Sequence, residues 1–216
     1  MMKTSRKDVP IVVVKRLPRY YRYLGELLRQ GVKRISSGEL SEKMGVTASQ
    51  IRQDFNCFGG FGQQGYGYNI ERLYKEIADI LGLTHGYKTI IVGAGHLGHA
   101  LANHSNFAKR GFELVGIFDK SPDLTGVLIR DLPVRPMEEL EAFCTENRVD
   151  IAILALPKSA IEMVVPRLVK LKIKGLWNFS YTDIAVPEDV AVENVHLSDS
   201  LMTLSYKITQ AQDTEK

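Results

Sequence analysis

The spacing of hydrophobic residues along the chain changes near residue 86. Before it, apolar side chains recur every three or four residues, as at Ile70, Leu73 and Ile77, which is the spacing of one face of an amphipathic helix. After it, short continuous apolar runs alternate with helical patterns, as in sheets buried on both faces. The longest of these runs are residues 89–92, 112–118 and 150–156.

This alternation of strands and helices predicts an α/β fold with a Rossmann-like, doubly wound parallel sheet. Further strands are expected at residues 127–129, 175–179 and 195–197, and helices near residues 137–143 and 161–168. Residues 198–216 are expected to form a C-terminal helix and tail, with Leu201, Leu204 and Ile208 apolar. The pattern therefore divides the chain into residues 1–85, 86–197 and 198–216.

Residues 1–85 read as helices joined by short turns. A flexible leader, residues 1–14, is expected to precede a helix that begins near Pro18 and ends at Gly31. Two short capped helices follow, joined at a glycine. Their capping boxes are Ser36 with Glu39 and Thr47 with Gln50, and Gly45 lies between them. A further helix is expected after its N-cap, Asn69.

Two short helices joined by a tight glycine turn are typical of a helix-turn-helix, whose second helix enters the DNA major groove. Arg and Gln side chains there read guanine and adenine. The residues at this position are Ser49, Gln50, Arg52 and Gln53. The alternative is a plain helical hairpin with a polar outer face. Glycine and aromatic residues at 58–68 favour a two-stranded wing over a second phosphate loop, because no strand precedes them.

The charge distribution supports this interpretation. Residues 1–85 carry 14 Lys and Arg against 8 Asp and Glu, whereas residues 86–216 carry 14 against 17. Such an asymmetry indicates that the N-terminal part meets a polyanion, although a solvated basic face would produce the same count.

A glycine-rich motif directly follows the first buried strand of the second domain. In the pattern Gly93-x-Gly95-x-x-Gly98, the first glycine permits a tight turn, the second lets a pyrophosphate approach the backbone, and the third lets the helix pack closely on the strand. Phosphates are expected at the helix N-terminus. The predicted cofactor-binding residues of this loop are Gly93, Ala94, Gly95, His96, Leu97 and Gly98. The alternative is a glycine turn in an ordinary α/β domain.

An acidic residue ends the next strand at the position where dinucleotide-binding folds hold the ribose 2′-hydroxyl. This residue is Asp119. Because its carboxylate would repel a 2′-phosphate, the sequence predicts NAD(H) rather than NADP(H) as the cofactor.

Composition excludes several classes of protein. The chain has 216 residues, 44% of them hydrophobic, and its apolar stretches are shorter than the ~20 residues that span a membrane. Cys57 and Cys144 lie far apart without a CxxC pattern, so a reducing cytoplasm and packing thiols are expected, with a redox thiol as the alternative. The five histidines lack a matching ligand set, so no metal site is expected.

Several motifs together resemble the Rex family of bacterial redox-sensing transcriptional repressors. They are Lys15-Arg16-Leu17-Pro18 with Tyr20-Tyr21-Arg22-Tyr23, Ser36-Ser37-x-x-Leu40, Gln50-Ile51-Arg52-x-Asp54, Phe58-Gly59, Gly65-x-Gly67-Tyr68, the glycine loop, Asn178-Phe179, Val186-Pro187 and Val192-Glu193-Asn194-Val195. The resemblance covers nearly the whole chain.

The resemblance implies a homodimer that binds a palindromic operator in double-stranded DNA. It also implies that NADH is the signal that releases the protein from DNA, and that NAD+ competes poorly with NADH. It implies a winged helix-turn-helix domain and a C-terminal helix swapped between subunits. Arg52 would face bases, while Lys15, Arg16 and Arg19 would hold phosphates. Arg22 is similar to the family arginine whose partner changes between states.

The sequence departs from the family at two switch positions. His104 and His196 stand where relatives carry a tyrosine and an aspartate, and Asp199 follows three residues after the second of these. We therefore expect Asp199 to be the partner of Arg22, with the two histidines as the alternative. 

Two other functions are open at this stage. An NAD-dependent oxidoreductase would need a proton donor beside the nicotinamide, and the sequence marks none. A nucleotide-binding module without DNA activity would leave the capped helices and the wing unexplained. The sequence therefore predicts a regulator rather than an enzyme.

Overall fold

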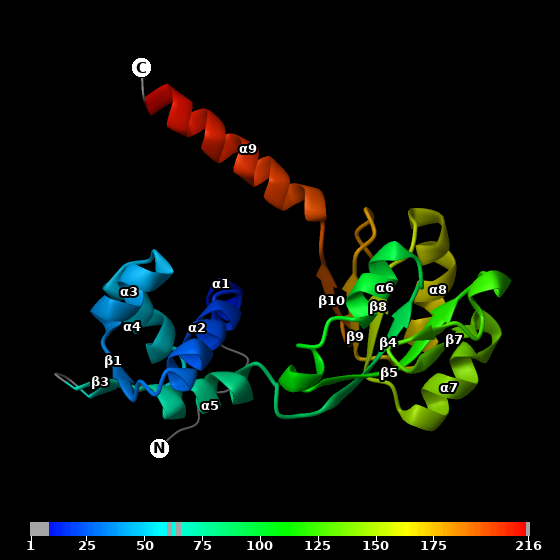
Figure 1. The fold of residues 1–216 in the computed structure, drawn as a ribbon, viewed down its shortest axis with the longest axis horizontal. Coiled ribbons are helices and arrows are strands. Elements are labelled where there is room, and N and C mark those ends of the chain that lie inside the picture. Colours follow the sequence, from blue (N-terminus) through cyan, green and yellow to red (C-terminus); the bar gives the residue numbers. More distant parts are fainter. Residues whose placement is uncertain (1–8, 60–61, 64–65, 215–216) are drawn as a thin grey trace. The chain divides into compact units, whose positions relative to one another are not determined.

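The computed structural model describes residues 9–59, 62–63 and 66–214 of the chain. The chain divides into two compact units, Met1–His85 and Gly86–Lys216, called here the N-terminal and the C-terminal unit (Figure 1). Residues 1–8 of the expected leader, and residues 60–61 and 64–65 of the expected wing, lie outside the described part of the chain.

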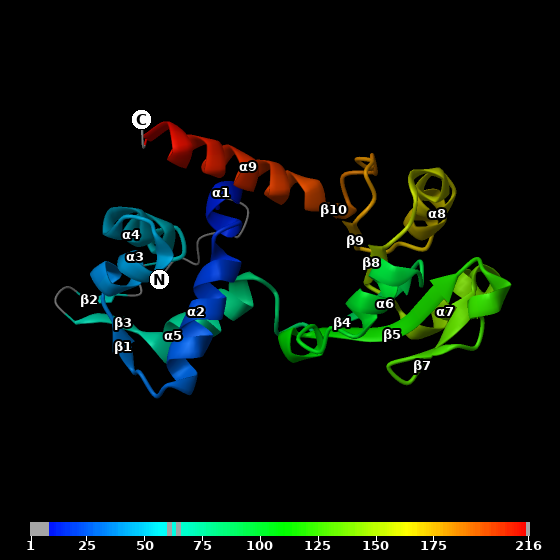
Figure 2. The ribbon, with the colours of Figure 1, turned by 45° about the horizontal axis from the view of Figure 1, so that its top comes forward.

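The N-terminal unit combines helices with a small antiparallel sheet. Its helices are α1 (Ile11–Val14), α2 (Leu17–Arg29), α3 (Ser37–Met44), α4 (Ala48–Asn56) and α5 (Ile70–Ile80). Its strands are β1 (Arg34–Ile35), β2 (Gly62–Gln63) and β3 (Gly67–Asn69), in the order β1-β3-β2. In both ribbon views α3 and α4 lie side by side, which gives the predicted helix-turn-helix with a β2–β3 wing (Figures 1 and 2).

The first of the two capping boxes forms as predicted. The Glu39 N–H donates to Ser36 Oγ at 3.1 Å, and the Ser36 N–H donates to Glu39 Oε2 at 2.7 Å. These hydrogen bonds lower the pKa of Glu39. The second box is half present. Thr47 Oγ1 accepts the Gln50 N–H at 3.1 Å, but the Gln50 side chain donates to Asp54 instead of returning to the cap.

The apolar stripes predicted for this unit meet in one core. The side chains of α2 pack against α5, and those of α3 against α4. The largest fully buried members are Leu17, Tyr20, Leu24, Leu40, Ile51, Phe55, Ile70, Leu73 and Ile77. The expectation that residues 11–14 belong to a flexible leader is wrong, because they form α1 and Val13 is 6% exposed.

The C-terminal unit is built on a seven-stranded sheet in the order β10-β9-β8-β4-β5-β7-β6. Its strands are β4 (Tyr87–Val92), β5 (Phe112–Asp119), β6 (Leu128–Ile129), β7 (Leu132–Pro136), β8 (Ile151–Leu154), β9 (Gly175–Asn178) and β10 (Ala191–Asn194). Its α-helices are α6 (His96–Ala102), α7 (Leu140–Asn147), α8 (Lys158–Lys170) and α9 (Leu197–Thr214). Short 3-10 turns are η2 (Ala108–Arg110), η3 (Pro122–Leu124) and η4 (Met137–Glu139).

Alternate strand residues pack on the two faces of this sheet. Ile90, Val92 and Leu154 lie in the cluster that includes residues of α7 and α8. Ile91, which lies between Ile90 and Val92, and Ile153, which precedes Leu154, belong instead to the cluster on the opposite face of the sheet. That cluster also includes Ala102 of α6. The sheet is therefore doubly wound, as predicted.

The structure corrects the expected strands at both edges of the sheet. The last strand is β10 (Ala191–Asn194), whereas residues 195–197 lead into α9, so the prediction of a strand there is wrong. At the other edge, β6 pairs antiparallel with β7, a strand for which no expectation was made. The remaining pairs are parallel among the described residues.

Candidate functional site

The glycine loop after β4 has the geometry of a nucleotide cradle. Gly93 has φ +101°, and a Cβ there would collide with the carbonyl oxygen of Ala155. A Cβ on Gly98 would collide with the carbonyl oxygen of Gly93, so α6 packs directly on the turn. Beside Gly95, in contrast, a Cβ would have open space within 4 Å. The loop thus leaves free the position where a pyrophosphate approaches the backbone, and these residues fit a dinucleotide.

Asp119 lies beside this loop at the end of β5. Its Oδ2 accepts the N–H of Ala94 at 2.7 Å and its Oδ1 accepts the N–H of Ser121 at 2.8 Å. The two bonds hold the carboxylate in place. A carboxylate has about four acceptor sites, so two are left for hydroxyl donors such as those of a ribose.

The loop also lies at the point where the strand order reverses. From β4 the chain continues to β5 on one side and later to β8 on the other side of β4. In open α/β sheets, ligands bind at the carboxyl ends of the strands at such a point. A cavity of about 390 Å³, lined by residues that include Cys144, Arg148 and Lys172, lies before β8 and β9 and shares no residue with the loop.

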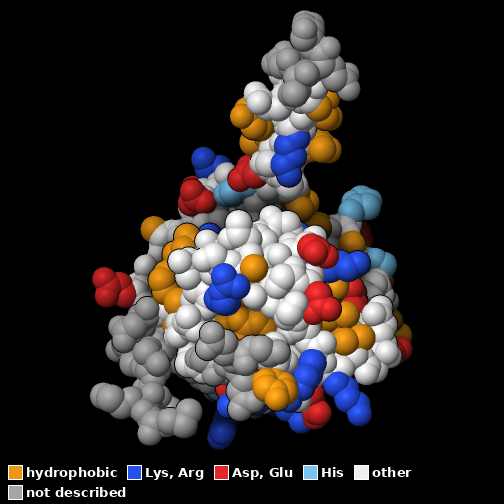
Figure 3. Space-filling view, turned by 90° about the vertical axis from the view of Figure 1, so that its left-hand side faces the viewer, with side chains coloured by type: hydrophobic (Ala, Val, Ile, Leu, Met, Phe, Trp, Pro, Cys, Tyr) orange, Lys and Arg blue, Asp and Glu red, His pale blue; other side chains and the backbone are white. Residues whose placement is uncertain are grey.

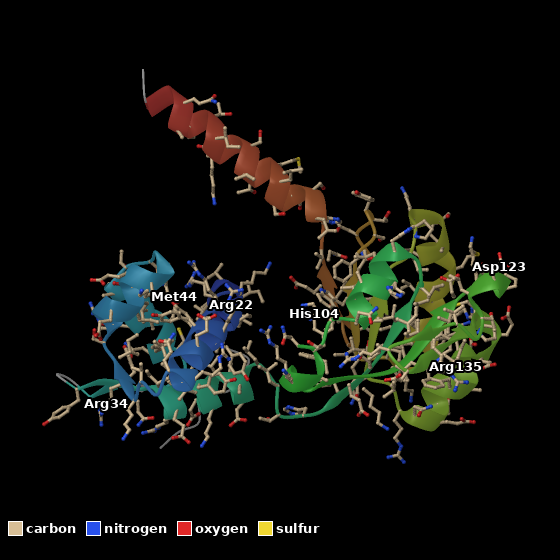
Figure 4. The ribbon with its side chains drawn as sticks, in the orientation of Figure 1. Arg22, Arg34, Met44, His104, Asp123 and Arg135 are labelled. Carbon is tan, nitrogen blue, oxygen red and sulfur yellow. The ribbon has the colours of Figure 1, made fainter. Side chains whose placement is uncertain are left out.

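The predicted switch residue His104 begins a row of aromatic side chains after α6. Its ring stacks on Phe107 at 4.5 Å between centroids, and Phe107 meets the edge of Trp177 at 5.5 Å. Trp177 in turn meets Phe179 at 4.6 Å. His104 itself is exposed (Figure 4).

His196 and Asp199 lie where β10 leads into α9. His196 Nε2 lies 3.2 Å from Asp183 Oδ1, and the His196 side chain is 23% exposed. Asp199 lies in the first turn of α9 and is exposed, and its N–H donates to the His196 carbonyl oxygen. Asp183 is a partner that the sequence reading missed.

The N-terminal end of α4 presents most of the predicted base-reading residues. Ser49, Arg52 and Gln53 are exposed, and the Arg52 Nη1 donates to Ser37 Oγ at 3.0 Å, which holds the arginine across α3 and α4. Gly45 between the helices has φ +62°, as the tight turn requires. Gln50 is half-buried, and its Nε2 donates to Asp54 Oδ1 at 2.9 Å.

Arg16 differs from the other cations predicted to hold phosphates. Lys15 and Arg19 are exposed. Arg22 on α2 is exposed as well (Figure 4). The Arg16 guanidinium instead forms two bonds to the fully buried Asp54, Nε to Oδ2 at 2.7 Å and Nη2 to Oδ1 at 2.6 Å. Burial alone would raise the pKa of Asp54, but hydrogen bonds from Arg16, Gln50 and Tyr20 hold it below its usual range.

Arg34 of β1 is a further cation that the sequence reading did not single out. Its Nη1 donates to the Tyr66 carbonyl oxygen at 3.1 Å, and its guanidinium lies 5.9 Å from the centre of the Tyr66 ring. It therefore ties the start of β3 to β1. Arg34 and Tyr66 lie 32 positions apart in the sequence, so no short-range pattern predicts their contact.

Other kinds of site find no support in the described residues. Across residues 9–59, 62–63 and 66–214, no group of three His, Cys, Asp or Glu side chains is placed to hold a metal ion. In the same ranges, no helix combines the length and apolar character needed to cross a membrane.

A winged helix-turn-helix joined to a Rossmann-like unit with a glycine loop defines a nucleotide-responsive DNA-binding protein. Two family models match the two units separately. The family described as "Putative DNA-binding protein N-terminus" matches residues 8–56, and the family described as "CoA binding domain" matches residues 84–182.

Whole proteins and solved structures match over nearly the full chain. The "Redox-sensing transcriptional repressor Rex" of Thermoanaerobacter pseudethanolicus is 57% identical over 209 residues, 97% of this chain and 93% of that protein. The protein of the same name from Clostridium kluyveri is 56% identical over 201 residues, 93% of this chain and 96% of that protein.

A crystal structure of RSP in complex with beta-NAD+ and operator DNA matches with a TM-score of 0.89 at 57% identity, covering 96% of this chain and 95% of that chain. A structure of RSP in complex with beta-NADH matches with the same TM-score at 54% identity, covering 96% and 98%. The chain belongs to the Rex family of redox-sensing transcriptional repressors. Members of this family are regulators rather than enzymes, so the oxidoreductase alternative is not supported.

Proposed function

We propose that this protein represses transcription by binding operator DNA as a homodimer, and that NADH releases it from the DNA. The observation that carries the proposal is the presence, in one chain, of an exposed polar end of α4 and of a glycine loop that is open above Gly95 and flanked by Asp119. Solved relatives are complexes with beta-NADH and with beta-NAD+ and operator DNA. NADH would bind more tightly to the arrangement of the dimer that cannot bind DNA, and DNA would bind to the alternative arrangement. Each ligand would therefore lower the affinity for the other.

In this proposal, Gly93, Gly95 and Gly98 shape the pyrophosphate site and Asp119 holds the adenosine ribose. The bound dinucleotide supplies only its redox state as a signal. Arg52, Ser49 and Gln53 contact bases, and Lys15 and Arg19 contact phosphates, since all five side chains are exposed on the N-terminal unit.

Homodimerisation is supported by the apolar surface of α9. Leu197, Leu201, Leu204 and Ile208 recur at helical spacing and are 61%, 67%, 51% and 52% exposed. Orange hydrophobic side chains line this helix at the top of Figure 3. A contiguous exposed stripe of this kind marks a protein interface. A second copy of the chain is the partner that the family resemblance implies, with α9 exchanged between subunits and a palindromic operator matching the dimer's symmetry.

The cytoplasm is the compartment we propose, because the cofactor and the chromosome meet there in bacteria. Both cysteines are free thiols, Cys144 buried and Cys57 half-buried, as expected for a protein in a reducing compartment.

A mobility-shift titration tests the proposed function. The purified protein is mixed with a palindromic promoter fragment and with a scrambled fragment, and NADH and NAD+ are added in separate series. We expect selective binding that NADH reverses at concentrations where NAD+ does not. An Arg52→Ala variant is expected to lose roughly 1–3 kcal/mol of specific binding while keeping its NADH affinity. Selective binding that is insensitive to NADH, or no preference for the palindrome, would contradict the proposal.

A further inference from the structure

A buried carboxylate joins α4, the proposed recognition helix, to the start of α2. Asp54 lies on α4 between Ile51 and Phe55 on the inward face, and it is 0% exposed. It accepts four hydrogen bonds from three side chains. Arg16 supplies two of them, and the Tyr20 hydroxyl donates to Oδ2 at 2.8 Å. Gln50 supplies the fourth, from within α4 itself.

These bonds saturate the carboxylate. A buried charge is tolerated only when it is paired and its acceptor sites are filled, and four bonds fill the four acceptor sites of Asp54. The flat guanidinium of Arg16 meets both oxygens at once, which fixes direction as well as distance. Because Arg16 and Tyr20 belong to the start of α2, the carboxylate sets how α4 lies against α2.

The same bonds change the roles of two predicted DNA-binding residues. Arg16 donates from both its Nε and its Nη2 to Asp54, and its side chain is 31% exposed. Gln50 has its amide nitrogen bound to Asp54, so the orientation of its amide is set before DNA arrives. In contrast, Arg19, one turn further along α2, is exposed.

We propose that Asp54 is the positioning residue of the recognition helix, and that Arg16 serves it instead of binding a DNA phosphate. Asp54 holds α4 at the angle that presents Arg52 to bases and holds the Gln50 amide in one orientation. This inference rests on the proposed DNA-binding function. It predicts that the network determines sequence discrimination, not the general attraction to DNA.

The salt dependence of binding separates the two roles of Arg16. Each phosphate contact contributes about −0.9 to the slope of log K against log salt concentration. The measurements are affinities for the palindromic and the scrambled fragment over a range of salt concentrations. They are made for the parent, Arg16→Gln, Asp54→Asn and the double variant. Arg19→Gln is the matched control, since it removes an exposed cation from the same helix.

For Arg16→Gln and Asp54→Asn we expect discrimination between the fragments to fall by roughly tenfold, the lower range of one lost base contact. The salt slope should stay at the parent value. The double variant should lose no more than either single variant, because both remove the same pair. Arg19→Gln should instead lower the binding affinity for both fragments equally and reduce the magnitude of the salt slope by about 0.9.

The proposal is overturned if Arg16→Gln reduces the salt slope by about 0.9, as a phosphate contact would. It is also overturned if the folded variants, checked by thermal unfolding, discriminate as well as the parent. Should a charge-removing variant not fold, Tyr20→Phe removes one neutral donor and must still reduce discrimination without changing the slope. If the parent itself does not prefer the palindrome, the proposed function fails, whereas a selective parent with equally selective variants contradicts only the role of Asp54.

Discussion

At the scale of single residues, two glycines of one loop perform different tasks. Gly98 carries no side chain because the turn at Gly93 fills the space, whereas Gly95 faces open space that a ligand can occupy. A methyl group at Gly98 would therefore collide with the protein itself, whereas we expect one at Gly95 to collide only with the bound cofactor. The two effects can be separated by measuring stability and NADH binding on the same pair of variants.

We expect Gly95→Ala to keep the parent's melting temperature. Its affinity for NADH should fall by roughly tenfold, which corresponds to about 1.4 kcal/mol of binding free energy. Gly98→Ala should lower the free energy of unfolding by roughly 1–3 kcal/mol, the cost of overpacking. Thermal unfolding and calorimetric titration measure the two effects. A Gly95→Ala variant that binds NADH like the parent would show that the pyrophosphate does not approach this backbone.

Asp119 determines the choice between NADH and NADPH in our reading. Asp119→Ala should lower the affinity for NADH and reduce the difference between the affinities for NADH and NADPH. The reason is that the carboxylate is expected to hold the ribose hydroxyl and to repel a 2′-phosphate. Calorimetry with both cofactors measures the gap. Asp123→Ala, which removes an exposed acid shortly after the same strand, is the control. A parent protein that already prefers NADPH contradicts this role.

Local spacing explains why some of these residues could be predicted from the sequence and others could not. The glycine loop and Asp119 belong to consecutive elements, so their spacing along the chain fixes their spacing in space. Asp54 contacts Arg16 and Tyr20, which lie 38 and 34 positions away, and no short-range pattern encodes such pairs. The family resemblance implies a phosphate contact for Arg16, whereas its pair with Asp54 depends on the fold and has no signature in the sequence.

At the scale of elements, the strongly patterned helices and buried strands were predictable, and the edges were not. Central strands such as β4 are buried on both faces and therefore read as continuous apolar runs. At the edge, β10 has the sequence Ala191-Val-Glu-Asn194 with alternating half-buried positions, a weak signal that allowed residues 195–197 to be mistaken for the strand. The Asp54 carboxylate, which links α2 and α4, should make the packing of these two helices depend on pH.

We expect the stability of the N-terminal unit to depend on the Asp54 charge. The pKa of Asp54 is lower in the folded than in the unfolded state, so the ion pair stabilises the fold at neutral pH. This contribution is lost as the pH falls below about 4 and through the folded pKa. Asp54→Asn should be less stable than the parent by roughly 3 kcal/mol at pH 7, the low end for breaking a buried pair.

Urea unfolding between pH 7 and pH 3 measures this difference, because the parent should lose more stability than Asp54→Asn and the gap should close. The Glu39→Gln variant is the control, since Glu39 also has a lowered pKa but is exposed. A gap of equal size at both ends of the pH range would mean that the Asp54 charge does not contribute.

At the scale of the whole molecule, the repressor needs a connection between its cofactor unit and its DNA-binding unit. Arg22 belongs to the N-terminal unit, which is proposed to bind DNA. His104, His196 and Asp199 belong to the C-terminal unit, which is proposed to bind the cofactor. His196 has an acidic neighbour, Asp183, and Asp199 is exposed at the start of the helix that we propose pairs with a partner subunit. Asp199 is therefore the carboxylate that we propose as the partner of Arg22, because it lies three residues after His196, where the family carries an aspartate.

We predict that Asp199→Ala uncouples the two sites. The variant should bind NADH and operator like the parent, but the NADH concentration needed for release should rise roughly 5-fold or more, the lower range of allosteric coupling. A mobility-shift titration of parent and variant measures this shift. Asp183→Ala is the companion variant, because it removes the acid beside His196 and leaves Asp199 in place.

The histidines give a different signature. If His104 and His196 carry the switch, His104→Gln and His196→Gln should raise the NADH concentration needed for release, whereas Asp199→Ala should not. That outcome would assign the switch to the histidines.

The aromatic row after α6 makes the protein its own optical reporter. Trp177 is the one tryptophan of the chain, and it lies in the C-terminal unit between Phe107 and Phe179. All indole fluorescence therefore comes from the cofactor unit, and the DNA-binding unit emits only through its tyrosines. Since indole emission overlaps the absorption of reduced but not oxidised nicotinamide, NADH should quench Trp177 by energy transfer while NAD+ does not. The redox state of the bound cofactor can thus be followed by fluorescence without a label.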